Sequence, residues 1–343
     1  MSEIKRVKPW KIFLPVLIGL LAVAYMFMKE FEPSAFDEID FKWRSVFWLL
    51  AAIICIVGRD FGYIMRIRTL SENKLTWRQA FRVIMLWEFT SAVTPSSIGG
   101  TSVALMYVHK EGISIGKSSA IVMMTSLLDE IYFVLMFPIL MFAIGIPELF
   151  DIEDSPGWTH GMFWLAMIGY TIKFVWVMAL IYGMFVNPKG LGKMIFILFK
   201  LPFLKRWKRK AVKALREIEL SSTELKFRKK SFWIKAFLTT FVSWTSRYWI
   251  VNCLFLAFFT VHDHFRIFAR QLVMWVAMLI TPTPGGSGVA EIMFSKYLGE
   301  FIPLAGFAVA LALLWRLVTY YPYLIIGAFM VPRWISDKFI SNK

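Results

Sequence analysis

Cysteine and histidine are scarce in this sequence, which contains two Cys and four His among 343 residues. Cys55 and Cys253 both lie inside apolar runs, so we expect two small packing residues and no disulfide framework. The histidines do not cluster with cysteines or carboxylates at the spacing typical of metal sites. The sequence therefore predicts neither a metal site nor a cofactor.

Charged residues are also few, at 18% of the sequence, and acidic ones are the rarer kind. The 39 Lys and Arg against 23 Asp and Glu give a formal net charge of +16 at pH 7. In a soluble protein this excess would suggest a nucleic-acid partner. Here 58% of the residues are hydrophobic and the mean hydropathy is +0.61, so we expect basic loops facing anionic lipid headgroups and no nucleic acid.

Nucleotide-binding and nucleophile motifs are absent from the sequence. Residues 285–288 read Gly-Gly-Ser-Gly, but the Lys-Ser or Lys-Thr pair that completes an ATP-binding loop does not follow. No Gly-x-Ser-x-Gly nucleophile elbow is present. These absences favour a protein that is neither an ATP-driven pump on its own nor an enzyme.

Long apolar runs, by contrast, are abundant. Six of them reach or approach the roughly 20 residues that a helix needs to cross a bilayer. They are residues 12–28, 45–65, 118–146, 162–186, 233–260 and 303–331. The sequence therefore predicts one all-α polytopic integral membrane domain over residues 1–343, with no appended soluble enzyme.

The loops between these runs differ in charge. Residues 29–44 and 147–160 are acidic, whereas residues 59–82 and 187–235 are basic. Because basic loops stay in the cytoplasm, we expect both termini there, together with an amphipathic basic loop at 187–235 that lies on the lipid surface. The expected location is the plasma membrane of a bacterium or an archaeon.

A short motif occurs twice in the chain. Residues 94–104 begin Thr-Pro and contain Gly-Gly, and residues 281–290 repeat this pattern with one residue fewer. Both copies interrupt apolar sequence, where Thr-Pro and Gly-Gly are expected to break a helix. Broken segments at corresponding places in two halves of a membrane protein point to a transporter's binding site.

The loop charges require that the two segments holding these copies do not cross the membrane. Residues 83–117 would enter and leave from the cytoplasm, and residues 267–300 would do so from outside. Two inverted re-entrant hairpins are thus predicted, with tips that meet near the midplane and line a cavity. The alternative is two independent Pro-kinked helix pairs without a shared site.

Ionisable side chains inside apolar segments are costly and are candidates for function. One interpretation is that they form internal ion pairs, such as Asp129 with Arg247 or Glu291 with Arg316. The other is a polar path in which glycines shape the site, Arg247 and Arg316 hold a phosphate, and carboxylates bind a cationic group or a proton. Lys173 is a weaker candidate, because it could extend to the membrane surface.

The polar path predicts substrate-binding residues and no catalytic or metal-binding ones. These residues are Glu88, Thr94, Pro95, Gly99, Gly100, Asp129, Glu130, Arg247, Thr281, Pro282, Pro284, Gly285, Gly286, Gly288, Glu291, Arg316 and Tyr320.

The same residues resemble a known family. The resemblance rests on the Pro and Gly-Gly stretch at 88–104, Leu-Leu-Asp-Glu at 127–130, Thr-Pro-Thr-Pro-Gly-Gly-Ser-Gly-Val-Ala-Glu at 281–291 and the Leu-Leu-Trp-Arg motif with Tyr-Tyr-Pro and Gly at 313–327. The chain resembles, over nearly its whole length, the flippase-like transmembrane domain of the lysylphosphatidylglycerol synthases. The resemblance implies lipid translocation and, without the soluble aminoacyl transferase domain, no lysine transfer.

Two departures from the family pattern leave the headgroup preference open. Residues 105–107 read Leu-Met-Tyr where the family commonly carries an Arg, and Asp129-Glu130 stand where it often has Glu-Arg.

The leading hypothesis is a flippase that moves an anionic phospholipid or polyprenyl-phosphate headgroup between leaflets. One alternative is an intramembrane transferase or phosphatase using Glu88, Asp129 and Glu291 as acid and base. Another is a membrane partner that recruits a separate lipid-modifying synthase through the basic residues 205–210. The small and aromatic residues of the spans permit a homodimer without requiring it.

Overall fold

The computed structural model describes residues 41–94, 97–150, 156–187, 227–278, 289–304 and 307–340. Every regular element in these ranges is helical, which confirms the predicted all-α class. Four helical stretches are long and apolar enough to cross a membrane, judged by length and composition. They are α3 (Trp43–Leu70), α6 (Ile115–Ile144), Thr159–Val186 and Phe307–Lys338.

These four stretches match four of the six predicted spans. Thr159–Val186 comprises most of α8 (Pro156–Ile181) and the π-helix η1 (Tyr182–Val186). The fifth predicted span forms one helix, α11 (Lys230–Phe258), but it carries Lys and Arg side chains along with several hydroxyls and is not among the four. The first predicted span, residues 12–28, lies outside the described ranges.

The last predicted span is interrupted, which corrects the expectation of one continuous helix. It consists of α14 (Phe307–Thr319) and α15 (Tyr321–Ile335), followed by the π-helix η4 (Ser336–Ile340). Tyr320 breaks the helix, with φ −124° and ψ −56°. Pro322 follows in the first turn of α15, where it lacks the N–H that would continue the helical hydrogen bonds.

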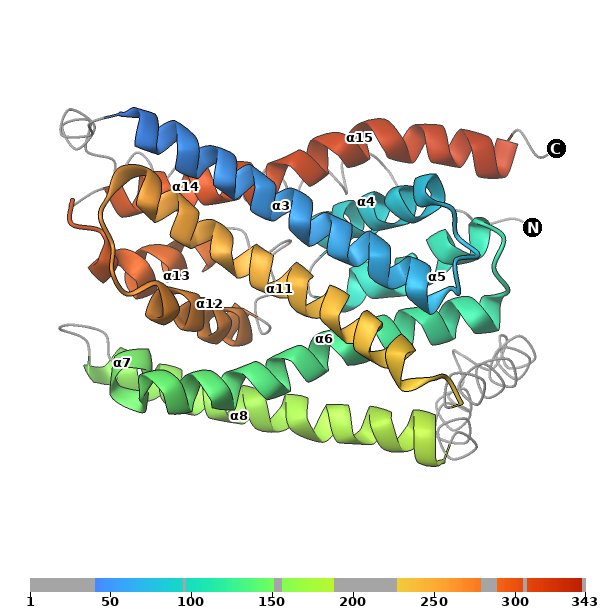
Figure 1. Cartoon of the computed structure of the whole chain (residues 1–343), viewed down its shortest axis with the longest axis horizontal. Helices are drawn as coiled ribbons and strands as arrows, with labels where there is room; N and C mark the ends of the chain where they lie inside the picture. Colours follow the sequence, from blue (N-terminus) through green and yellow to red (C-terminus); the bar gives the residue numbers. More distant parts are fainter. Residues whose placement is uncertain are drawn as a thin grey trace.

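Helices α3 and α11 pack along each other through the middle of the molecule (Figure 1). Their contact is close because two glycines, Gly58 and Gly62, lie on the face of α3 that contacts α11. A Cβ on Gly62 would clash with Ser243 Oγ and lie 2.8 Å from the Thr239 carbonyl oxygen, and one on Gly58 would lie 3.3 Å from Ser246 Oγ. Small residues allow two membrane helices to approach in this way.

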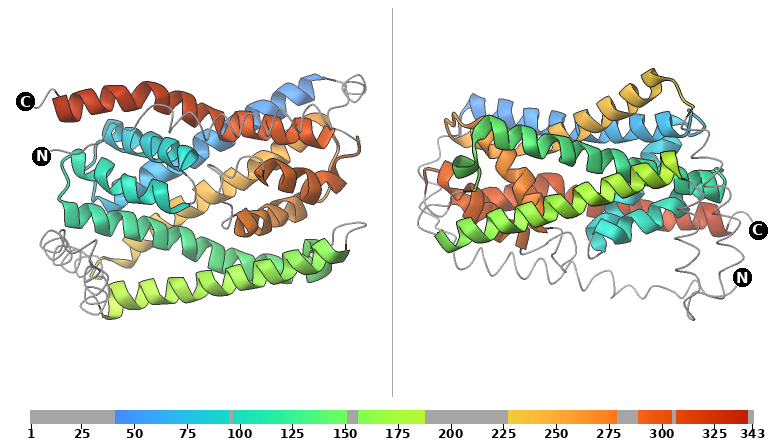
Figure 2. Two further views of the ribbon diagram at one scale, coloured as in Figure 1. Left: turned by 180° about the vertical axis from the view of Figure 1, so that it is seen from behind. Right: turned by 90° about the horizontal axis from the view of Figure 1, so that it is seen from below.

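Two helix pairs lie in opposite halves of the molecule. Figure 1 shows α4 (Trp77–Val93) and α5 (Ser97–Lys110) in one half, and α12 (His264–Met278) and α13 (Val289–Leu298) in the other. Short elements complete the described fold: α7 (Ile146–Phe150) and the 3₁₀ turn η3 (Gly299–Phe301). Figure 2 shows α6 and α8 side by side along one side of the molecule.

Each helix pair is an antiparallel hairpin. In the first, Gln79 Nε2, in the first turn of α4, donates to the Glu111 carbonyl just after α5, at 3.3 Å. In the second, Arg270 Nη1 of α12 donates to the Tyr297 carbonyl near the end of α13, at 3.0 Å. The start of one helix thus lies beside the end of the next in both pairs.

In the first hairpin, the break between the two helices precedes Gly-Gly. Helix α4 ends at Val93, as expected for a segment approaching Pro95, and α5 begins at Ser97. Gly99 and Gly100 therefore lie in the first turn of α5, which corrects the expectation that they break the helix. A Cβ on Gly100 would clash with Ser91 Oγ, so this glycine permits the close packing of α5 on α4.

Candidate functional site

The buried apolar residues form two clusters, one around each hairpin. The first surrounds α12 and α13, and the second surrounds α4 and α5. Four long helices, α3, α6, α8 and α11, contribute to both clusters, and the first three carry charged residues at the point where they pass from one cluster to the other. On α3 these are Arg59 and Asp60, on α6 they are Asp129 and Glu130, and on α8 it is Lys173. Polar side chains from several helices therefore form a central polar belt between two apolar cores.

Arg59 is the first centre of this belt. Its guanidinium, 2% exposed, forms an ion pair with Glu88 of α4 and lies 3.7 Å from Asp60. The Tyr323 hydroxyl of α15 donates to both Asp60 carboxylate oxygens at 2.9 Å. Glu88, predicted from the sequence, therefore joins the first hairpin to α3.

Arg66 is the second centre, two helical turns further along α3. It forms an ion pair with Asp129 of α6 and donates to Thr240 Oγ1 of α11 at 3.2 Å. Trp244 Nε1 donates to the same Asp129 carboxylate at 2.6 Å. Asp129 is therefore held by α3 and α11 together.

Arg59 and Arg66 are not among the predicted site residues, because both were counted as charges of a basic cytoplasmic loop. The structure places them inside α3, where they are buried. Their spacing of seven residues, with Tyr63 between them, puts all three on one helical face. Both guanidinium groups lie over the Tyr63 ring, at 5.4 and 4.8 Å from its centre. If residues 59–66 are taken as helical, the spacing of positions 59, 63 and 66 indicates this face from the sequence.

Arg247 of α11 does not pair with Asp129, so that interpretation is wrong. Its guanidinium lies 5.3 Å from the centre of the Trp244 ring. Among the described residues it has no carboxylate partner in an ion pair. Arg247 is half-buried, so its charge remains available to an anion.

Lys173 of α8 extends inwards, and the expectation that it could reach the membrane surface is wrong. It is buried and forms an ion pair with Glu130. Its ammonium group lies 4.3 Å from the centre of the Trp275 ring and 5.1 Å from that of Phe133. The cation is therefore stabilised by one carboxylate and two aromatic faces.

Glu291 and Arg316 do form the expected internal ion pair, at 2.8 Å and with side chains 2% and 6% exposed. The guanidinium lies 3.8 Å from the centre of the Tyr320 ring. The Tyr320 hydroxyl donates to the Ala92 carbonyl near the end of α4, at 3.0 Å. This pair therefore connects the second hairpin, the helix break at Tyr320 and the first hairpin.

The carboxylates of the belt are more accessible than the arginines behind them. The side chains of Asp60, Glu88 and Asp129 are 18%, 22% and 23% exposed, against 2% for Arg59 and 4% for Arg66. A group that enters the belt therefore meets these carboxylates before the guanidinium groups of Arg59 and Arg66. The belt can therefore bind a cation or a proton at the carboxylates and an anion at Arg247.

Several predicted residues lie outside the belt or outside the described ranges. The Thr94 hydroxyl donates to the Thr90 carbonyl at 2.7 Å and ends α4. The second motif copy is not described, and neither is the proline of the first. These residues are Pro95, Thr281, Pro282, Pro284, Gly285, Gly286 and Gly288. Within the described ranges, no group of three or more His, Cys, Asp or Glu is arranged to hold a metal ion.

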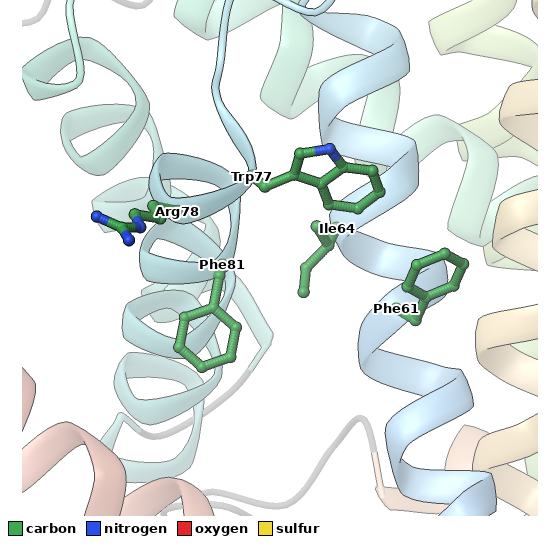
Figure 3. A pocket seen from close by; sticks show the side chains of 5 residues that line it. All are labelled: Phe61, Ile64, Trp77, Arg78 and Phe81. Carbon is green, nitrogen blue, oxygen red and sulfur yellow. The ribbon is translucent and has the colours of Figure 1, made fainter.

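A groove of about 380 Å³ opens on the outer surface between α3 and α4, away from the belt. Figure 3 shows the rings of Phe61, Trp77 and Phe81 around Ile64, with Arg78 extending away from them. Its surface is almost entirely apolar, which suits contact with a lipid chain.

The comparisons with known proteins agree with the resemblance noted in the sequence. The family described as "Lysylphosphatidylglycerol synthase TM region" matches residues 12–327. A protein described as "UPF0104 membrane protein" from Archaeoglobus fulgidus is 25% identical over 344 residues, covering 96% of this chain and 98% of the relative. Both matches extend over nearly the whole length of the chain.

Proposed function

The chain belongs to the family of the lysylphosphatidylglycerol synthase transmembrane region, and from this premise we propose that it moves a lipid headgroup between the two leaflets of a membrane. It is a multi-pass membrane protein. The lipid would carry an anionic phosphate, as in a phospholipid or a polyprenyl phosphate. Its apolar tails would stay in the bilayer while the headgroup passes through the protein.

The observation that carries this proposal is the central polar belt. Charged side chains from α3, α4, α6 and α11 meet between two apolar clusters, far from the ends of the long helices. Ionisable groups at such a depth usually line a path for a polar substrate. The partial exposure of the carboxylates supports a path that opens towards this belt.

The two hairpins support the same function. We infer that α4–α5 enters from the cytoplasm and α12–α13 from outside, with both termini of the chain in the cytoplasm of a bacterial or archaeal cell. In this arrangement the two hairpins approach the belt from opposite sides. Non-crossing helices around a midplane site are characteristic of transporters that expose a site alternately to the two sides.

The roles of individual residues follow from their partners. Arg247 is the phosphate-binding residue in this proposal, because the other arginines of the belt already pair with carboxylates. Asp129 and Glu130 contact the headgroup from the accessible side. Arg316 and Glu291 act as positioning residues that connect the two hairpins.

The test is lipid movement by the purified protein in liposomes. The vesicles contain a fluorescent anionic phospholipid, and dithionite quenches only the outer leaflet. We expect quenching beyond the outer half, and its loss in Arg247→Gln. Arg228→Gln is the matched control, because Arg228 pairs with Glu72 outside the belt, at 2.6 Å.

Quenching that stops at half for every lipid tried, with and without a proton gradient, would overturn the proposal. Formation of a new lipid product by the purified protein would favour an intramembrane enzyme over transport.

A further inference from the structure

We propose that the ammonium group of Lys173 fills a built-in site for ammonium ions and thereby makes the protein select a lipid headgroup that lacks an amine. The inference rests on the proposed lipid transport and names the class of headgroup. It starts from the side chains that surround Lys173.

Three side chains around Lys173 form an ammonium cage. Glu130 pairs with the Lys173 ammonium group, and the centres of the Trp275 and Phe133 rings lie 4.3 and 5.1 Å from it. The two rings stack with their centres 4.2 Å apart and an angle of 7° between their planes, so each fixes the orientation of the other. A carboxylate beside aromatic faces is the combination that attracts an ammonium ion in a poorly solvated site.

Three helices position this cage. Glu130 and Phe133 lie three residues apart in α6 and therefore on one face of that helix. Lys173 belongs to α8, and Trp275 lies in the last turn of α12. The ammonium cage therefore joins the second hairpin to the long helices α6 and α8.

The ammonium cage borders the part of the belt that holds Asp129. The centres of the Trp275 and Trp244 rings are 5.6 Å apart, and Trp244 Nε1 donates to Asp129 at 2.6 Å. The Glu130 side chain is 20% exposed and that of Lys173 only 7%. A headgroup that reaches Asp129 therefore lies next to the ammonium cage and can approach it from the carboxylate side.

The internal ammonium group changes what these carboxylates can bind. Asp129 is paired with Arg66 and Glu130 with Lys173, so each negative charge already has a positive partner. An amine on a headgroup would have to displace the buried Lys173 ammonium from its carboxylate and from both rings, which is costly. Paired carboxylates can still accept hydrogen bonds from hydroxyl groups. The selected headgroup is therefore a phosphate ester that carries hydroxyls, such as glycerol, and no amine.

Chemical rescue tests the ammonium cage itself. Lys173→Ala removes the ammonium group and the methylene groups beyond Cβ, which are the groups that n-propylammonium supplies. We expect a lower melting temperature for this variant in detergent, and a rise that saturates as propylammonium is added. Propanol, which has a similar size and no charge, should give no such rise. In Lys173→Ala/Glu130→Gln the rescue by propylammonium should be lost.

Lys117→Ala is the matched control for the rescue, because Lys117 pairs with Glu72 at 2.8 Å outside the belt. Propylammonium should leave the melting temperatures of this control and of the wild type unchanged. Equal effects of propylammonium and propanol on Lys173→Ala, or a rescue that survives Glu130→Gln, would overturn the ammonium cage.

The liposome assay tests the selectivity with Lys173→Met, which keeps most of the side-chain volume. The vesicles contain phosphatidylglycerol or phosphatidylethanolamine, each with the fluorescent label on an acyl chain. The wild type should move phosphatidylglycerol at least about tenfold faster. Lys173→Met should lower this ratio, because the emptied cage can accept the ethanolamine ammonium. Lys173→Met/Glu130→Gln should not gain movement of phosphatidylethanolamine, which separates the cage from a change in net charge.

Equal movement of the two lipids by the wild type, or an unchanged ratio in Lys173→Met, would overturn the selectivity and leave transport standing. No movement of any lipid by the wild type would overturn the proposed transport and the selectivity with it. Rescue of Lys173→Ala by propylammonium would even then support the ammonium cage, so the two failures are distinguishable.

Discussion

At the scale of single residues, most charges in the apolar part of this protein occur in pairs. Four basic side chains each form an ion pair with a carboxylate on another helix: Arg59, Arg66, Lys173 and Arg316. Removing one partner from a buried pair costs much more than the pair contributes, because the remaining charge stays buried without compensation. A substitution in the belt should therefore be tolerated when it leaves no buried charge without a partner, and should be destabilising when it does.

Arg59 provides the sharpest residue-scale prediction. Single neutralisation of Asp60 or Glu88 leaves the guanidinium one partner and should lower the free energy of unfolding only slightly. The double variant Asp60→Asn/Glu88→Gln leaves a buried charge unpaired, and a loss of about 3–5 kcal/mol is expected. Thermal unfolding in detergent measures the stability of the three variants and the wild type. A loss in the double variant equal to the sum of the two single losses would contradict the shared partner.

Glu72 gives a prediction of pH dependence outside the spans. Burial alone would raise the pKa of its carboxyl, but Lys117 at 2.8 Å and Arg228 at 2.6 Å outweigh it and hold the pKa below its ordinary value. A lowered folded-state pKa stabilises the protein above the unfolded pKa of about 4.3, and this contribution is lost as the pH falls through the folded value.

Glu72→Gln should therefore reduce stability at pH 7 by at most about 1 kcal/mol, since the pair is partly exposed. The difference should shrink below about pH 4, where the wild-type carboxyl begins to protonate. Thermal unfolding of both proteins across this range checks the sign. A difference that grows towards acid pH would contradict the ion pairs.

At the scale of elements, the pairing of α3 with α11 positions the belt. Gly58 and Gly62 of α3 face Ser246 and Ser243 of α11, and Ser243 Oγ donates to the Arg59 carbonyl at 3.0 Å. This close approach brings Arg66 within reach of Thr240. Separation of the two helices would therefore disturb stability and the belt together.

Gly62→Ala tests this contact. The added methyl group would clash with Ser243 and press on the Thr239 carbonyl, so a loss of about 1–3 kcal/mol is expected. Gly161→Ala is the control, because a Cβ at this position meets nothing within 4 Å. Alanine is also favoured over glycine inside a helix such as α8. The control should be neutral or stabilising in thermal unfolding, and equal losses in the two variants would argue against the α3–α11 contact.

At the scale of the whole molecule, two apolar clusters are held together across the belt by α3, α6, α8 and α11. Each cluster contains one hairpin. The two halves of the chain meet where α3, from the first half, packs against α11, from the second. The two cysteines lie on these two helices, Cys55 on α3 and Cys253 on α11, and both are free thiols.

Oxidation should therefore link the two halves through Cys55 and Cys253. A protease site is inserted after Lys210 and the oxidised protein is cleaved there. On denaturing gel electrophoresis the two fragments should migrate together without reductant and separately after reductant is added. Cys253→Ser should give two fragments under both conditions. Separate fragments from the oxidised wild type would contradict the packing of α3 on α11.

The sequence by itself determined the all-α membrane class, the family, four of the spans and two interrupted segments. These properties follow from local composition, because run length and Thr-Pro breaks need no knowledge of distant contacts. It also identified Glu88, Asp129, Glu130, Glu291 and Arg316 as polar candidates within apolar segments, since a charge within an apolar run is visible locally.

Only the tertiary structure decided which charges are partners. Asp129 pairs with Arg66, 63 positions away, and not with Arg247. Arg66 looked like a loop charge because α3 continues to Leu70, beyond the apolar run 45–65, whereas Arg59 lies inside that run but was assigned to the basic stretch 59–82. Pairing depends on which helix faces approach each other, and here that is set by glycines that let α3 and α11 touch.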